Sequence, residues 1–215
     1  MKRNILIMAL FTIGVAAEKT TILSSSSEWI DLNQSLKTEY ITYNNIVSFC
    51  FEKGTMVTMA DGSSKPIEKV TPGDKILSVN TLEMSVENDI VEKVDSAICN
   101  NFVKIFFDDL TMNVNTDDHL YYVKGKGWCS VNPESTFRKY KVRAGSLKPG
   151  DDCYKILNGR LVNVKISTIQ RIPGRQTGFS IVKLNKNSSF FANGKLVSIE
   201  EVETIKEQSR TKLKK

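Results

Sequence analysis

The stretch CFEKGTMVTMADGSSKPIEKVTPGDKILSVN, residues 50–80, alternates short strand-like runs with tight turns. Thr55–Met59 has the composition of a β-strand, and the Ala60–Gly62 segment after it contains an Asp-Gly pair, which suits the positive backbone angles of a hairpin. Thr71–Asp74 contains Pro-Gly, which predicts a second turn, and a strand resumes at Lys75–Val79. The stretch therefore predicts a β-rich module that begins at its first residue.

The rest of the chain continues this pattern of short strands, and the sequence therefore predicts an all-β fold. Only Ile199–Lys215 favours a helix or a tail. Further strands are expected at Pro66–Val70, Ser85–Val94, Phe102–Phe107, Thr111–Val114, His119–Val123, Trp128–Val131, Cys153–Leu157, Leu161–Ile169, Phe179–Leu184, Phe190–Phe191 and Lys195–Val197.

An internal repeat lies within this β-rich region. The segment EKVTPGDKIL, residues 68–77, resembles GSLKPGDDCYKI, residues 145–156. Each has an apolar residue two positions before a Pro-Gly-Asp turn and a strand after it. The repeat predicts a duplicated β architecture with pseudo-twofold symmetry.

Residues 1–17 have the features of a secretory signal. Lys2 and Arg3 make a basic start, and the apolar run Ile5–Ala17 is shorter than the about 20 residues that a membrane-spanning helix needs. We expect cleavage after Ala17, a secreted or extracytoplasmic protein, and no stable membrane span afterwards. An uncleaved anchor is the alternative. Residues 18–49 then form a short N-terminal segment, too small to be a domain.

The charge is basic overall, at +6 for 215 residues. Much of the excess lies near the end of the C-terminal tail, residues 200–215, in Lys206, Arg210, Lys212, Lys214 and Lys215. A basic tail of this kind is usually solvated. No basic stripe interleaved with aromatic residues is present, and an exported chain rarely meets nucleic acid, so nucleic acid is not an expected partner.

Four cysteines are present, at positions 50, 99, 129 and 153. In an exported protein an even number suggests disulfides, and four cysteines allow three pairings. The chain contains no Cys-x-x-Cys pair and only one histidine, so a structural zinc site is not expected, and no cofactor is indicated.

Cys50 is the first residue of the β-rich module, so the Phe49–Cys50 peptide bond is a candidate substrate. A cysteine thiolate can attack the preceding carbonyl and convert the amide into a thioester. The departing amine needs an acid, and His119, the only histidine, suits proton transfer because its unperturbed pKa is about 6.5. Thr116 lies three residues earlier, where its hydroxyl could bind the scissile backbone. A lone histidine is otherwise more often a surface or satisfied core residue.

These residues carry a resemblance to the Hint domains, the self-processing modules of hedgehog proteins and inteins. Residues 50–80 resemble the first motif of that family. NTDDHLYYVKGKGW, residues 115–128, is similar to its Thr-x-x-His motif, and FSIVKLNKNSSFFANGKLV, residues 179–197, resembles its closing motif. The resemblance covers residues 50–199 and implies a flattened all-β horseshoe with pseudo-twofold symmetry.

The resemblance also implies roles for particular residues. Cys50 would be the nucleophile, and Thr116 and His119 would distort the scissile amide and protonate its nitrogen. Some relatives use a carboxylate to activate an incoming nucleophile. Asp95 is one possible match, although a solvated acid at the end of a strand is the simpler interpretation.

Departures from the family pattern limit the reaction. Splicing inteins end in His-Asn followed by Cys, Ser or Thr, but here Val197 is followed by Ser198 and Ile199. The histidine often found before the Phe-Phe pair is replaced by Ser188. Ligation of flanking segments is therefore not expected, and too few residues follow Ile199 for the sterol-presenting region of hedgehog proteins.

The leading hypothesis is a single-turnover, self-cleaving precursor whose substrate is its own N-terminal segment. Cys50 forms a thioester with Phe49, and water or an external thiol, amine or alcohol releases the segment. The alternative is an inert secreted Hint scaffold that acts as a structural or binding module, with Cys50 in a disulfide. A cysteine hydrolase that acts on other proteins is a third, weaker hypothesis.

Overall fold

The computed structural model describes residues 49–201, which form an all-β fold with one short α-helix and one 3-10 helix. The all-β class expected from the sequence is confirmed. The elements are β1 (Phe51–Glu52), β2 (Met56–Thr58), β3 (Ser64–Pro66), η1 (Ile67–Lys69), β4 (Lys75–Asn80), β5 (Ser85–Cys99), β6 (Phe102–Phe107), β7 (Met112–Thr116), β8 (Tyr121–Val123), β9 (Gly127–Ser130), α2 (Pro133–Tyr140), β10 (Gly145–Ser146), β11 (Asp152–Leu157), β12 (Arg160–Ile172), β13 (Gln176–Leu184), β14 (Ser189–Ala192) and β15 (Lys195–Ser198).

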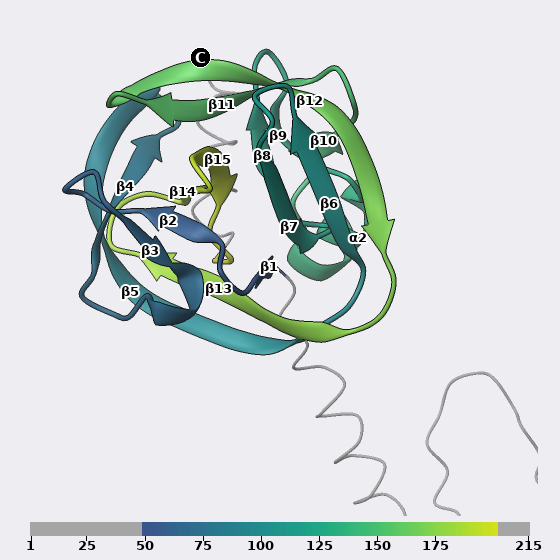
Figure 1. Ribbon diagram of the computed structural model, residues 1–215, viewed down its shortest axis with the longest axis horizontal. Helices are drawn as coiled ribbons and strands as arrows, with labels where there is room; N and C mark the ends of the chain where they lie inside the picture. The colour runs from purple at the N-terminus through teal and green to yellow at the C-terminus, as the bar shows by residue number, and fades with distance from the viewer. Residues whose placement is uncertain (1–48, 202–215) are drawn as a thin grey trace, which may run out of the picture. The chain divides into compact units, whose positions relative to one another are not determined.

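All these strands belong to one hydrogen-bonded sheet, in the order β3-β2-β14-β15-β8-β11-β12-β6-β7-β1-β13-β5-β4, with β9 and β10 beside β8. The long strands β5 and β12 curve around opposite sides of the view in Figure 1. The last strand of this path, β4, contacts β14, the third strand, where the Ser189 hydroxyl donates to the Val79 carbonyl at 3.0 Å. The sheet therefore encloses a single main core, which includes Phe51, Phe107 and Tyr121.

The internal repeat of the sequence is a structural repeat. In each Pro-Gly-Asp turn the glycine N–H donates to one residue of the following long strand, and the aspartate carbonyl accepts from the same residue. These bonds are Gly73 N to Val91 O (2.8 Å) and Val91 N to Asp74 O (2.9 Å) in the first half, and Gly150 N to Ile166 O (2.8 Å) and Ile166 N to Asp151 O (2.9 Å) in the second. The expected pseudo-twofold symmetry is confirmed.

The two halves exchange their last strands. The first half runs β4, β5, β6 and the second runs β11, β12, β13, but β6 pairs with β12 and β13 pairs with β5. The short strand β1 lies between β7 and β13 and pairs with both. This exchange brings β13, from late in the chain, to the first residues of the module.

Several elements differ from the sequence expectation, among them the two-residue strands β1 and β10, which were not expected. Pro66–Val70 is not a strand, since its middle residues form η1. The helix α2 was not expected, although Asn132 caps it by accepting from the Ser135 N–H at 3.1 Å, and Pro133 occupies its first turn. Strand β5 continues to Cys99, five residues beyond the expected end at Val94, because pairing with β13 supports it.

The expected signal peptide, most of the N-terminal segment and nearly all of the basic tail lie outside the described residues. Among residues 49–201, no helix is long and apolar enough to cross a membrane.

The first Pro-Gly-Asp turn depends on a single carboxylate. Asp74 Oδ2 accepts from Lys65 Nζ at 2.6 Å and from the Thr71 N–H at 2.8 Å. Partial burial acts to raise the pKa of Asp74, but these hydrogen bonds outweigh it and hold the pKa below its usual value of 3.8. The carboxylate therefore stabilises the fold in its ionised form.

We predict that Asp74→Ala lowers the free energy of unfolding by about 1 kcal/mol at pH 7, because one hydrogen-bonded ion pair is lost. A depressed folded-state pKa contributes stability above the unfolded pKa and loses it as the pH falls through the folded pKa. The difference between wild type and variant should therefore shrink below about pH 4. Urea unfolding at pH 7 and pH 3 measures this difference in the free energy of unfolding, with the exposed Glu83→Ala variant as the control. An equal difference at both pH values would contradict this role.

Candidate functional site

The Phe49–Cys50 peptide is buried at the centre of the fold. Phe49 is 1% exposed and Cys50 is fully buried. The next residue, Phe51, lies opposite Asn115 of β7 on one side and Phe179 of β13 on the other. Strand pairing on both sides therefore fixes the peptide that the sequence identified as a candidate substrate.

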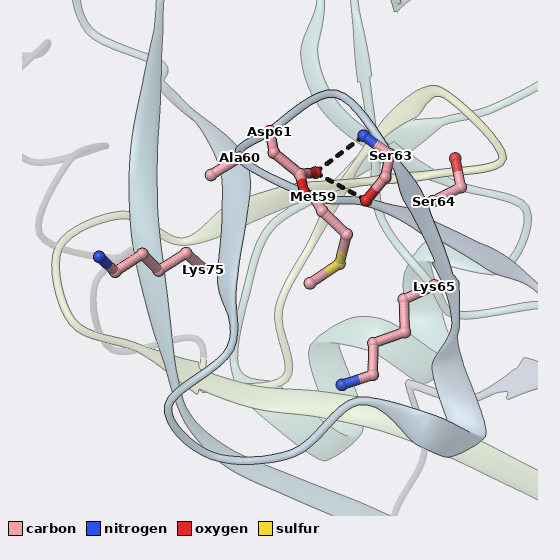
Figure 2. A pocket seen from close by; sticks show the side chains of 7 residues that line it. All are labelled: Met59, Ala60, Asp61, Ser63, Ser64, Lys65 and Lys75. Atoms are coloured by element: carbon pink, nitrogen blue, oxygen red, sulfur yellow. Dashed lines mark hydrogen bonds between the residues drawn. The ribbon is translucent and has the colours of Figure 1, made fainter.

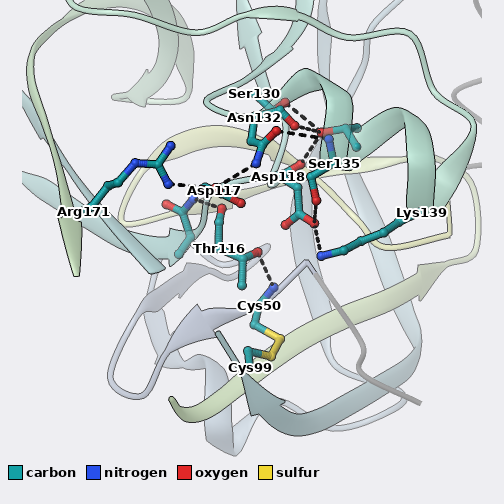
Figure 3. A network of polar contacts seen from close by, with 12 residues as sticks. Cys50, Cys99, Thr116, Asp117, Asp118, Ser130, Asn132, Ser135, Lys139 and Arg171 are labelled. Atoms are coloured by element: carbon teal, nitrogen blue, oxygen red, sulfur yellow. Dashed lines mark hydrogen bonds and ion pairs between the residues drawn. A yellow bond between two sulfur atoms is a disulfide. The ribbon is translucent and has the colours of Figure 1, made fainter. Parts of the chain in front are cut away.

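The nitrogen of this peptide contacts the predicted threonine. The Cys50 N–H donates to Thr116 Oγ1 at 3.3 Å (Figure 3). In return, the Thr116 N–H donates to the Cys50 carbonyl at 3.0 Å. Thr116 is the last residue of β7, and the strand therefore sets both contacts. The structure brings Cys50 and Thr116 together at the atom that would become the leaving amine.

The carbonyl of the same peptide has a partner that the sequence did not indicate. The Ser180 hydroxyl of β13 donates to the Phe49 carbonyl oxygen at 2.6 Å. Phe179 is paired with Phe51, so Ser180 comes next along β13 toward Cys50. Only the exchange of β13 between the halves reveals this contact, since no local sequence pattern marks Ser180.

His119 packs beside the same peptide. Its ring centroid lies 5.2 Å from that of Phe49 and 4.3 Å from that of Phe51, the two residues that flank Cys50. Its backbone N–H donates to the Thr116 carbonyl at 3.1 Å, which closes the turn between the two motif residues. The structure thus places both residues of the Thr-x-x-His motif at the Phe49–Cys50 bond.

The imidazole of His119 is buried and neutral. Burial lowers its pKa to about 3, although the Ser198 carbonyl acts in the opposite direction. Nε2 lies 3.2 Å from the Ser198 oxygen, and a carbonyl can only accept, so Nε2 carries the proton. Nδ1 is buried and has no hydrogen-bond partner among residues 49–201. The ring therefore presents one unused lone pair.

The sulfur of Cys50 forms a disulfide with Cys99 in the structure. Cys99 is the last residue of β5, 49 positions later in the sequence. Gly178 of β13 leaves room for this bridge, because a Cβ atom there would lie 2.3 Å from Cys50 Cβ and 2.9 Å from its Sγ. In this state Cys50 is not available as a thiol nucleophile.

The other two cysteines, Cys129 and Cys153, are free and buried. Burial raises the pKa of both thiols, that of Cys153 to about 12. Reactivity follows the thiolate, so neither is a competing nucleophile at neutral pH.

Asp95 does not lie at the end of a strand. It is an exposed residue within β5, paired across the sheet with Ser180, and its Oδ1 accepts from the N–H of its neighbour Ser96 at 2.7 Å. The structure therefore confirms an exposed acid and shows no contact of its carboxylate with the Phe49–Cys50 bond.

Two buried carboxylates lie between the motif residues and were not singled out from the sequence. Asp118 Oδ2 contacts Lys139 Nζ of α2 at 2.6 Å, and Asp117 Oδ2 contacts Arg171 at 3.2 Å (Figure 3). Burial raises the pKa of Asp118, although Lys139 opposes this shift. These ion pairs tie the Thr116–His119 turn to α2 and β12, and they fix the position of the motif.

The downstream end of the module also lies at the site. Ser198 provides the carbonyl that holds His119, and the Ile199 N–H donates to the Ser188 carbonyl at 3.0 Å. The hydroxyls of Ser188 and Ser198 are buried. The end of β15 is thus held both to His119 and to the residue before β14.

Two surface pockets are lined by residues other than those around the Phe49–Cys50 bond. One, of about 460 Å³, is lined by the β2–β3 hairpin and the start of β4, and Figure 2 shows Asp61 bonded to Ser63 within it. The other, of about 450 Å³, lies along α2 and includes Phe137 and Arg143. Within the part of the chain that the structure describes, no group of three or more His, Cys, Asp or Glu side chains could hold a metal ion.

Solved structures with a similar fold are inteins and an intein-like domain. A DnaB intein from Synechocystis sp. is 14% identical with a TM-score of 0.57, and the match covers 71% of this chain and 99% of the intein. A bacterial intein-like domain from Clostridium thermocellum is 21% identical with a TM-score of 0.56, covering 70% of this chain and 98% of that domain. These likenesses show that the fold is of the Hint type.

Curated relatives share a shorter region. Ataxin-1 of Homo sapiens is 24% identical over 127 residues, which is 56% of this chain and 15% of that protein. Ataxin-1-like of Homo sapiens is 24% identical over 134 residues, 60% of this chain and 19% of that protein. The chain thus spans less than a fifth of the length of these relatives.

The family of the Ataxin-1 and HBP1 module (AXH) matches residues 51–158, about half of the chain. This region begins directly after Cys50 and runs through β1 to the β11–β12 turn, within the Hint-type fold. The chain therefore belongs to the AXH family.

Proposed function

We propose that this module cleaves its own Phe49–Cys50 bond once the Cys50–Cys99 disulfide has been reduced. The observation that carries the proposal is the hydrogen bond from the Cys50 N–H to Thr116 Oγ1, at the nitrogen that must leave. This bond fixes the orientation of the scissile nitrogen, which must gain a proton from another group before it can leave.

The first step is thiol–disulfide exchange with a dithiol reductant. One thiolate of the reductant attacks a sulfur of the Cys50–Cys99 bridge, and its second thiol resolves the mixed disulfide. The products are two protein thiols and one oxidised dithiol, and electrons and protons balance.

The second step is the acyl shift. Cys50 Sγ attacks the Phe49 carbonyl carbon, the carbon–nitrogen bond breaks, and a thioester joins Phe49 to the Cys50 sulfur. Because His119 is neutral, it cannot supply a proton at the outset. It first takes the thiol proton on Nδ1, the nitrogen with the unused lone pair, and then gives it to the departing Cys50 nitrogen.

The third step resolves the thioester. Water, or an external thiol, amine or alcohol, attacks the Phe49 carbonyl and regenerates the Cys50 thiol. The chain then begins at Cys50 with a free amine, and the upstream segment carries the acyl group. With a secretory signal removed after Ala17, that segment is residues 18–49 of an extracytoplasmic precursor. Each chain reacts once, with its own N-terminal segment as substrate.

The second candidate is an inert scaffold that acts as a structural or binding module. The disulfide favours it, since Cys50 is occupied and the space left by Gly178 accommodates the bridge. The AXH match also omits both Cys50 and Ser180. In that case reduction exposes a thiol but leaves the peptide bond intact.

Reduction of the full chain at neutral pH should yield a fragment that begins at Cys50. Hydroxylamine, which intercepts thioesters, should increase the yield, and Cys50→Ala should stay intact because it has no nucleophile. Intact-protein mass spectrometry measures both species. A reduced wild type that keeps its full mass with hydroxylamine, as the Cys50→Ala control does, would favour the inert scaffold.

Removing the partner of Cys50 should remove the need for a reductant. We predict that Cys99→Ala cleaves without added dithiol, because Cys50 remains a free thiol. The matched control is Cys129→Ala, which alters a buried free cysteine and should still require reduction. Mass spectra of samples purified without reductant compare the two. If Cys99→Ala still depends on dithiol, the disulfide does not control the reaction.

His119→Ala should slow cleavage by about a hundredfold or more, since positioned proton transfer contributes about 10²–10⁴ in rate. Cleavage is followed by gel densitometry in dithiol. Thermal unfolding of the same samples separates lost proton transfer from lost folding. A folded His119→Ala protein that cleaves at the wild-type rate would exclude the proposed proton route.

A further inference from the structure

We infer that Ser180 provides the hydrogen bond that stabilises the oxyanion formed at Phe49 during self-cleavage. The inference rests on the proposed function and assigns it a further catalytic residue. Ser180 touches the reacting carbonyl directly, since its hydroxyl lies 2.6 Å from the Phe49 oxygen.

Strand pairing aims this hydroxyl. Phe51 pairs with Phe179 and Glu52 pairs with Gly178, so the antiparallel register continues with Ser180 beside Cys50. Gly178 and Ser180 are two positions apart and share one face of β13. On that face the glycine leaves space for the Cys50 sulfur, and the serine reaches the Phe49 carbonyl.

A break in pairing lies one residue beyond Ser180, after Ile181. The register between β13 and β5 shifts between Ile181 and Lys183. Irregularities of this kind occur beside active sites, where they re-aim a side chain. Ser180 is 3% exposed, so its hydroxyl meets the carbonyl in a site that excludes water.

The chemistry explains why such a bond accelerates the reaction. When Cys50 Sγ attacks, the Phe49 carbonyl becomes a tetrahedral alkoxide, and full negative charge develops on the oxygen that Ser180 already contacts. A hydrogen bond to an ionised oxygen in a dry site is stronger than one to a neutral carbonyl. The Ser180 proton stays on its oxygen throughout, while the thiol proton moves separately to the amine.

The ground-state contact can be tested without cleavage. Phe-Cys occurs once in the sequence, so labelling Phe with ¹³C at the carbonyl and Cys with ¹⁵N gives one HNCO signal, from Phe49–Cys50. In the oxidised full chain, Ser180→Ala should move the Phe49 ¹³C resonance upfield, because the carbonyl loses a hydrogen bond. Ser180→Thr keeps a hydroxyl and should restore the shift.

The matched control is Ser189→Ala. Ser189 is also buried and also donates to a backbone carbonyl, that of Val79 at 3.0 Å. Its removal should leave the Phe49 resonance and the cleavage rate unchanged.

In dithiol, Ser180→Ala should cleave about a hundredfold more slowly than wild type, the usual loss for one oxyanion donor. An unchanged Phe49 resonance, or cleavage of Ser180→Ala at the wild-type rate, overturns the assignment. Failure of the proposed function gives a different result. Reduced wild type would then stay intact, which removes the oxyanion role, while the carbonyl resonance would still respond to Ser180.

Discussion

The double pairing of the two-residue strand β1 is the constraint on which the site depends. Phe51 lies between Asn115 of β7 and Phe179 of β13, and this pairing on both sides brings Thr116 and Ser180 to one peptide. Because β13 belongs to the second half of the repeat, the exchange of strands between halves builds the site. As a result, the Phe49–Cys50 peptide is contacted at its nitrogen by Thr116 and at its carbonyl oxygen by Ser180.

The Cys50–Cys99 disulfide fits two functions of this site. They differ in whether its reduction leads to cleavage of the Phe49–Cys50 bond. An oxidised Cys50 has no thiol to attack Phe49, so in the proposed reaction the bridge would preserve the peptide until a reductant acts. The same bridge would serve an inert AXH module as a cross-link between β5 and the start of β1. The contacts of Thr116 and His119 with the peptide favour the first function, because a purely structural bridge requires neither.

Much of the fold could be predicted from the sequence, because its signals are local. The Asp-Gly pair marked the β2–β3 hairpin, and the Pro-Gly-Asp turns marked the starts of β4 and β11. The Thr-x-x-His spacing placed Thr116 and His119 in one turn. The Cys50–Cys99 pairing could not be predicted, since it depends on β5 continuing along β13. Ser180 was missed because its contact depends on β13, from late in the chain, pairing with β1. The helix α2 had a local signal, the Asn132-Pro133 cap, and could have been found.

The central claim is that the chain can produce a new amino terminus at Cys50. The most direct test incubates the reduced full chain with a fluorescent thioester peptide, which forms a stable amide only with an N-terminal cysteine. The account predicts a labelled protein whose first residue is Cys50, identified by tandem mass spectrometry. An unlabelled chain of full length, with a free Cys50 thiol, would contradict it.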